Sequence, residues 1–209
     1  MNEQNQSLFL PVQEWGHHVE ELLSHSESTD FSRANGLNEV GFKLLWIAKM
    51  RQEQPQLSVR SEVNAGGGTH FADLIAIDRA TATMHVMEFK YIPLEFIQLP
   101  SEVFRSTLGA RTSGSDEEMR IRLRDRAEYV RKSLGHVDRA RIRVHYFADQ
   151  QPGWYEVHEV ADSAVAQAAY MARQLALQYN VNHVHVYAVI GYGPFVWTKF
   201  ASLAYHPIG

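Results

Sequence analysis

Three short apolar runs joined by brief polar links constrain the fold of this chain more than any other feature. The runs cover residues 57–63, 71–77 and 84–91, and their side chains alternate or concentrate as in strands. The links are a glycine-rich turn at 64–69 and a short turn at 79–83. Because strands connected by such short links lie side by side in opposite directions, we predict an antiparallel meander.

Segments with helical spacing of apolar residues surround this meander. Residues 10–23 have that spacing, and so do residues 37–50, which follow the Asn35-Gly36 break and predict a mostly buried helix. The remaining expected elements are a helix at 116–134, a strand at 141–147, a helix at 162–179 and strands at 183–190 and 195–200. This order predicts an α/β fold, a mixed central β-sheet flanked by helices.

Length and composition indicate one globular domain over residues 1–209. The chain contains no cysteine, so disulfides and thiolate metal sites are excluded, and a metal would need oxygen or imidazole ligands. The apolar stretch 8–10 is too short for a signal-peptide core, and no apolar run approaches the roughly 20 residues of a membrane span. We therefore expect a soluble intracellular protein with no membrane partner, cytoplasmic or, in a eukaryote, nuclear.

The charge of the chain is unevenly distributed. The formal net charge is −4, yet residues 120–143 contain nine basic and three acidic side chains. Two interpretations of this basic segment remain open. It forms a stripe that faces phosphate groups, or it forms an ordinary solvated helix face.

Charged residues interrupt two of the apolar strands. Glu88 and Lys90 are two residues apart and project from the same face of their strand, with Phe89 turned the other way. Asp73 stands one hairpin away and can lie across from them. Buried charges are costly unless they are paired or bind a metal, so the three residues indicate either a salt bridge in the sheet or a metal site.

The metal interpretation fits phosphodiester hydrolysis, in which carboxylates hold a cation and a lysine stabilises charge on the phosphate oxygens. Asp73 followed by Glu88-Phe89-Lys90 resembles the motif of the PD-(D/E)XK nuclease superfamily, the restriction-endonuclease-like fold. Ala72 stands where the proline of that motif would be. The resemblance implies an α-β-β-β-α-β core over about 37–147, with a helical extension at 1–34 and an added helix and β-hairpin at 154–209.

The same resemblance implies roles for individual residues. Asp73, Glu88, the Phe89 carbonyl and Glu39 on the preceding helix would bind Mg²⁺ or Mn²⁺, and Lys90 would position the attacking water. Residues expected at the periphery of the site are His70, Gln98 and Tyr129. Residues expected to contact the phosphates of a nucleic acid are Arg120, Arg122, Arg124 and Arg126, which pair by four-residue spacing.

These residues together predict a divalent-metal-dependent nuclease, with DNA favoured over RNA only because DNA is the commoner substrate in the superfamily. The alternatives are a catalytically inactive module that binds nucleic acid or a protein, and an interaction or toxin-like domain of a larger protein that still has nuclease chemistry. The complete Asp-Glu-Lys set favours the enzyme. The acidic body of the chain favours a homodimer, or a partner protein or domain that delivers the substrate.

Overall fold

The computed structural model describes residues 9–25, 39–66, 70–99, 125, 127–148 and 151–204. Residues 125 and 127–134 are helical; the rest of the helix predicted at 116–134 lies outside the described residues. The other elements, in chain order, are α1 (Val12–His25), α3 (Glu39–Glu53), β1 (Ser58–Asn64), β2 (Phe71–Asp78), β3 (Thr83–Ile92), η3 (Leu94–Phe96), η4 (Arg139–Arg141), β4 (Arg143–Ala148), β5 (Gln151–Glu156), α6 (Val157–Tyr179), β6 (His183–Tyr192) and β7 (Phe195–Ala204).

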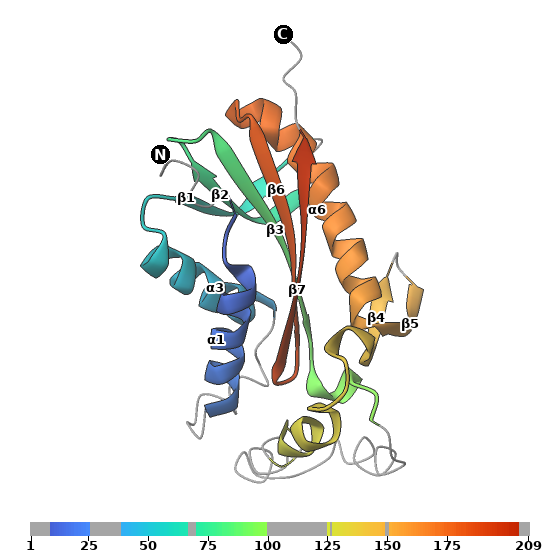
Figure 1. Ribbon diagram of the computed structural model, residues 1–209. Helices are drawn as coiled ribbons and strands as arrows, with labels where there is room; N and C mark the ends of the chain where they lie inside the picture. Colours follow the sequence, from blue (N-terminus) through green and yellow to red (C-terminus); the bar gives the residue numbers. More distant parts are fainter. Residues whose placement is uncertain are drawn as a thin grey trace.

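A five-stranded mixed sheet with the strand order β1-β2-β3-β6-β7 forms the centre of the molecule (Figure 1). The first three strands are an antiparallel meander, as predicted, and β6 and β7 are an antiparallel hairpin. Between these two units, β6 pairs with β3 in parallel, and α6 makes the crossover that a parallel pair requires. The predicted α/β class with a mixed central sheet is confirmed.

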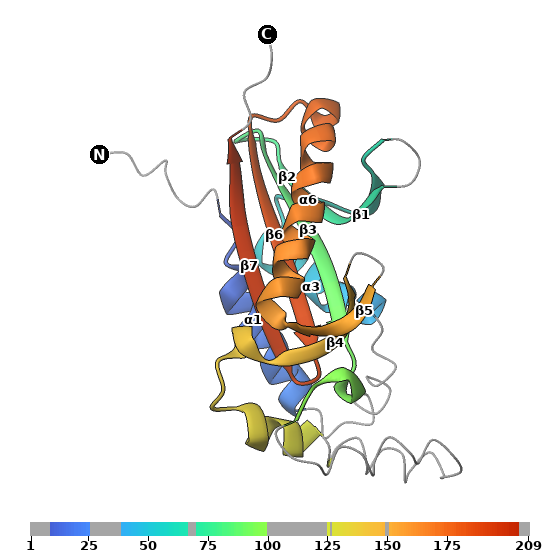
Figure 2. The ribbon, with the colours of Figure 1, turned by 90° about the vertical axis from the view of Figure 1, so that its right-hand side faces the viewer.

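Helices cover both faces of this sheet. Figures 1 and 2 show α1 and α3 on one face and α6 along the other. On the α3 face, Phe42, Trp46 and Met50 recur every four residues and are fully buried, as expected for a helix that lies on a sheet. On the opposite face, alanines of α6 pack against β3 and β6, and these small side chains let the helix approach the strands closely. In the described part of the chain, no helix is both long and apolar enough to cross a membrane.

The helix boundaries differ from the prediction where local caps and exposure intervene. α6 begins at Val157, five residues before the predicted start, because Glu156 and Glu159 form a reciprocal capping box. The prediction that α3 is mostly buried is wrong for part of its surface. Val40 and Leu44 are 55% and 57% exposed, since only one side of the helix contacts the sheet.

The strand predicted at 141–147 exists, but it lies outside the central sheet. As β4 it pairs with β5 in a separate two-stranded sheet, which lies beside the start of α6 (Figure 2). The strand that follows β3 in the central sheet is β6, so this sheet extends beyond the predicted core boundary at residue 147. Burial explains why β6, and not β4, pairs with β3. Every residue of β6 after His183 is buried, as a strand inside a sheet covered on both faces requires, whereas β4 keeps exposed residues on one face.

Gly191 of β6 permits the close approach of α3 to the sheet. A Cβ atom at this position would lie 2.8 Å from both the Phe42 ring and the Tyr91 ring. Such distances are shorter than ordinary van der Waals contact, so any larger residue would push α3 outward. The position of α3 matters because this helix carries residues of the candidate site described below.

We expect Gly191→Ala to lower the free energy of unfolding by about 1–3 kcal/mol, because the added methyl overpacks the α3 interface. The matched control is Gly16→Ala in α1, where a Cβ would lie 3.4 Å from Val196. This control should change stability little or raise it by up to about 1 kcal/mol, since alanine favours the helix. Urea denaturation of both variants measures the difference, and equal effects would contradict the packing argument.

Candidate functional site

The site lies where β2 and β3 begin to separate. Backbone pairing runs from Asp78 and Thr83 to Leu74 and Met87, and the next facing pair in this register is Asp73 with Glu88. Beyond Leu74 and Met87 a side chain accepts the hydrogen bond in place of a β2 carbonyl: the Phe89 N–H donates to Asp73 Oδ2 at 2.8 Å. This bond fixes the Asp73 carboxylate at the fork between the strands.

Glu88 is almost completely buried, with 2% of its surface exposed. Its Oε1 accepts a hydrogen bond from Lys90 Nζ at 2.6 Å, whereas its buried Oε2 has no hydrogen-bond partner among the described residues. Burial raises the pKa of Glu88 to about 7; the Lys90 charge opposes this increase, and the Asp73 and Glu39 charges add to it. The alternation that placed Glu88 and Lys90 on one face of the strand is confirmed by this contact.

Glu39 is the first residue of α3 and lies within electrostatic reach of the same group. Burial raises the pKa of its carboxyl; the Lys90 charge lowers it, and the Asp73 charge raises it. The Tyr91 backbone also forms a hydrogen bond with this carboxyl. The structure therefore brings the four predicted residues Asp73, Glu88, Lys90 and Glu39 together.

Two further charged residues belong to this group and were not predicted. Lys43 lies one helical turn after Glu39, is 6% exposed, and places its Nζ 3.5 Å from Asp73 Oδ1. It also forms an ion pair with Glu62 of β1. We call the six residues the acid–lysine cluster; its members are Glu39, Lys43, Glu62, Asp73, Glu88 and Lys90.

Signals for both additional residues are present in the sequence. Lys43 is four residues after Glu39 and is therefore on the same helix face. The β1–β2 register, which pairs Ser61 with Leu74 and Val63 with Ala72, sets Glu62 opposite Asp73. This register depends on the tertiary pairing of the strands, so the signal for Glu62 becomes readable only once the meander is aligned.

Tyr146 of β4 borders the cluster from a different sheet. Burial raises the pKa of its phenol; the Lys90 charge lowers it, and the Glu39, Glu88 and Asp73 charges raise it. The sequence did not predict Tyr146 at the site, because the approach of β4 to this end of β3 is a long-range contact. The β4–β5 hairpin is therefore a wall of the candidate site.

The residues predicted at the periphery are distributed more widely. The His70 ring meets the Tyr170 ring of α6 at 5.3 Å, and the Gln98 N–H donates to the Arg143 carbonyl of β4 at 2.8 Å. Tyr129 lies on the helical segment 127–134 and is 38% exposed. The proposed peripheral roles of these residues remain predictions. The predicted phosphate-binding residues lie outside the described residues; they are Arg120, Arg122, Arg124 and Arg126.

The side chains of the cluster offer a partial set of ligands for a divalent cation. No three Asp, Glu, His or Cys side chains of the described residues converge closely enough to hold an ion, and ammonium groups pair with Asp73 and Glu88. Among the described residues, Glu88 Oε2 is nevertheless a buried oxygen with no hydrogen-bond partner. Mg²⁺ is commonly held by one or two carboxylates and several waters, so Asp73 and Glu88 are the residues of the cluster that could hold one.

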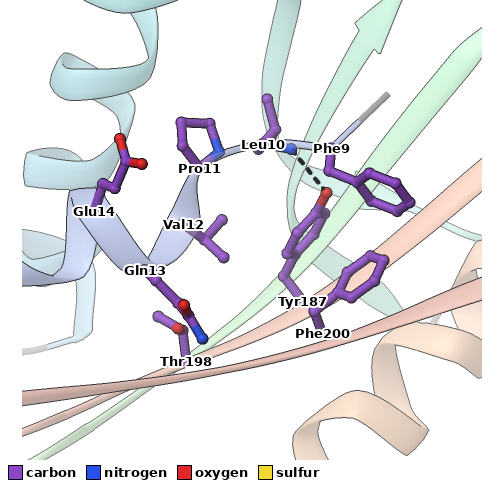
Figure 3. A pocket seen from close by; sticks show the side chains of 9 residues that line it. All are labelled: Phe9, Leu10, Pro11, Val12, Gln13, Glu14, Tyr187, Thr198 and Phe200. Carbon is purple, nitrogen blue, oxygen red and sulfur yellow. Dashed lines mark hydrogen bonds between the residues drawn. The ribbon is translucent and has the colours of Figure 1, made fainter. Parts of the chain in front are cut away.

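A separate cavity of about 320 Å³ lies between the segment that precedes α1 and the hairpin of β6 and β7 (Figure 3). The Leu10 N–H donates to the Tyr187 hydroxyl at 3.1 Å across one end of it. The cavity shares no residue with the acid–lysine cluster. Its lining consists of Phe9, Leu10, Pro11, Val12, Gln13, Glu14, Tyr187, Thr198 and Phe200.

Comparisons with known protein families, with curated proteins and with solved structures find no match to this chain.

The burial of Glu88 makes stability depend on pH in a defined direction. Its pKa in the folded protein, about 7, lies above the ordinary value of 4.5, so the folded state binds this proton more tightly. The resulting stabilisation is present below pH 4.5 and is lost as the pH rises through about 7. We expect the free energy of unfolding of the wild type to fall over this window by about 3 kcal/mol relative to Glu88→Gln. Urea denaturation from pH 4.5 to 8.5 measures the difference, and parallel curves for the two proteins would contradict it.

Proposed function

We propose that this chain is a divalent-metal-dependent nuclease that hydrolyses phosphodiester bonds at the acid–lysine cluster. The observation that carries the proposal is the gathering of Asp73, Glu88 and Lys90 at the fork of β2 and β3, with a buried carboxylate oxygen left without a partner. An unsatisfied buried acceptor is costly, and a bound cation is one way to satisfy it.

The order of elements supports the same proposal. α3, β1, β2, β3, α6 and β6 follow the α-β-β-β-α-β order of the PD-(D/E)XK superfamily core, with the motif residues on β2 and β3 and Glu39 on the first helix. In this view the β4–β5 hairpin is an insertion between β3 and α6, and α1 and β7 are additions at the two ends. The likeness rests on order and motif position.

The charges of the cluster suit phosphoryl chemistry. A bound Mg²⁺ or Mn²⁺ would supply positive charge for the phosphate oxygens and lower the pKa of a bound water. Asp73 and Glu88 would hold the ion with the Phe89 carbonyl, and Glu39 would bind its outer waters. Burial lowers the pKa of Lys90, but the Glu88 charge and hydrogen bond more than offset this, so its pKa is raised and it stays protonated. Lys90 therefore acts as a hydrogen-bond donor and a positive charge, and it does not act as a base.

A second candidate function is a binding module without catalysis. The ion pairs of Lys43 with Asp73 and of Lys90 with Glu88 favour this alternative, because they neutralise part of the site without any metal. Such a module would bind nucleic acid or a protein through the same fold. The two functions differ in whether a divalent cation is required.

The direct test incubates the purified protein with single- and double-stranded DNA and RNA in the presence of Mg²⁺, Mn²⁺ or EDTA. We expect cleavage only with metal, and a loss of about 10²–10³-fold in Asp73→Ala and in Lys90→Met, because each substitution removes a charge that stabilises the transition state. Lys49→Met is the control, since Lys49 lies on the same helix as Glu39 but pairs with Glu53. Cleavage that survives both site substitutions would refute the assignment, and binding without cleavage would favour the non-catalytic module.

The outer face of the β4–β5 hairpin indicates a class of substrate. His145 and Phe147 alternate along β4, and Trp154 faces His145 from β5. Phe147 is 64% exposed and Trp154 is 40% exposed, and their rings lie 6.0 and 5.4 Å from the His145 ring. The exposed Arg143 lies on the same face of β4. Exposed aromatic rings beside a cation suit the stacking of unpaired bases, so we propose a nucleic acid with a single-stranded segment.

DNA remains the preferred nucleic acid because it is the commoner substrate in the superfamily. A homodimer, or a partner that delivers the substrate, would compensate for the net charge of −4.

We expect Trp154→Ala to raise the KM for a single-stranded oligonucleotide about tenfold and to leave kcat nearly unchanged, because base stacking contributes to binding and not to chemistry. Phe200→Ala is the matched control, since Phe200 is an aromatic residue of β7 that is 41% exposed and packs against Phe9, His185 and Tyr187, away from the predicted site. Steady-state kinetics on single-stranded and duplex substrates measure the effect. An equal change in both variants, or none in either, would argue against the stacking face.

A further inference from the structure

Lys43 is held in place more firmly than a surface lysine. Its neighbours Phe42 and Trp46 are fully buried, and their rings pack edge-to-face against Phe89 at 6.1 and 6.0 Å. These contacts fix the turn of α3 from which Lys43 extends, with 6% of its surface exposed. The ammonium group is thereby directed between Glu62 and Asp73.

The charge state of Lys43 is equally well defined. A lysine ammonium group is protonated at neutral pH, and this one is paired with the carboxylates of Glu62 and Asp73. Lys43 therefore contributes a positive charge at this position. Its partner Glu62 has a backbone φ of +51°, a conformation that costs about 1–3 kcal/mol for a residue other than glycine. Such a conformation persists where surrounding contacts fix it, and the ion pair with Lys43 is one of these contacts.

The charges of the acid–lysine cluster do not balance in the free protein. With all four carboxylates ionised against two ammonium groups, the cluster carries a formal charge of −2. One divalent cation would neutralise the group, whereas two would leave an excess of +2 in a partly buried site, where unbalanced charge is costly.

We propose that the site takes a single divalent cation on the side of Asp73 and Glu88, and that Lys43 occupies the place of a second cation between Glu62 and Asp73. This inference rests on the metal-dependent site of the proposed function. In two-metal phosphodiesterases the ions lie about 3.5–4 Å apart and share a carboxylate. Here Lys43 Nζ lies 3.5 Å from Asp73 Oδ1, so Asp73 would be the carboxylate that contacts both Lys43 and the ion. Lys43 thus acts as a positioning residue that sets the number of metal ions.

The test counts ions on the full chain without nucleic acid. Isothermal titration calorimetry with Mn²⁺ should give one ion per wild-type chain. In Lys43→Met the aliphatic stem remains but the charge is lost, and we expect two ions per chain because Glu62 and Asp73 become free to bind one. Lys43→Arg and Lys49→Met are matched controls that should each keep a single ion.

Electron paramagnetic resonance on the Mn²⁺-saturated wild type gives an independent result, which keeps the proposal testable even where Lys43→Met does not fold. An isolated six-line spectrum supports one ion, and a spin-coupled pair overturns the proposal. A folded Lys43→Met variant that still binds one ion overturns it as well.

These outcomes separate the inference from the proposed function. Two ions in an active wild-type nuclease would refute the role of Lys43 and leave the nuclease intact. One ion in a wild type that cleaves no substrate, with two in Lys43→Met, would support the role of Lys43 and refute the nuclease. A wild type that binds no ion would refute both.

Discussion

The hydrogen bond from the Phe89 N–H to the Asp73 carboxylate is the contact on which the candidate site depends. It lies at the position where the backbone pairing of β2 and β3 stops, so the strands part around a carboxylate instead of continuing a ladder. The parting leaves room for the buried Glu88 carboxylate beside Asp73 and for Lys90 one alternation further along. A polar side chain that replaces a backbone partner at a strand end satisfies the amide and opens the sheet at the same time.

Helix α3 completes the site because it is held against the sheet at short range. Gly191 leaves space for the Phe42 ring, and the aromatic contacts among Phe42, Trp46 and Phe89 fix the helix along its length. Glu39 and Lys43, one turn apart on this helix, are then both brought near Asp73. Packing of an apolar helix face thus determines the electrostatics of the cluster.

The balance of charge in the cluster connects its stability with its proposed chemistry. Burial makes ionised Glu88 unfavourable, and Lys90 offsets only part of that cost, so the carboxyl retains its proton up to a pH of about 7. Lys90 and Lys43 both stay protonated. The cluster therefore holds two fixed positive charges beside carboxylates whose ionisation is opposed by burial.

The sequence by itself determined the local elements and four of the six residues of the cluster. Alternation along 71–77 and 84–91 was sufficient to predict the meander and the shared face of Glu88 and Lys90, because a strand's period is a local property. Only the tertiary structure decided that β6, and not the equally regular β4, pairs with β3, since the choice of a parallel partner depends on burial on both faces. Long-range packing likewise brought Tyr146 of β4 to the site. No local pattern encodes the convergence of three separate elements at one end of a strand.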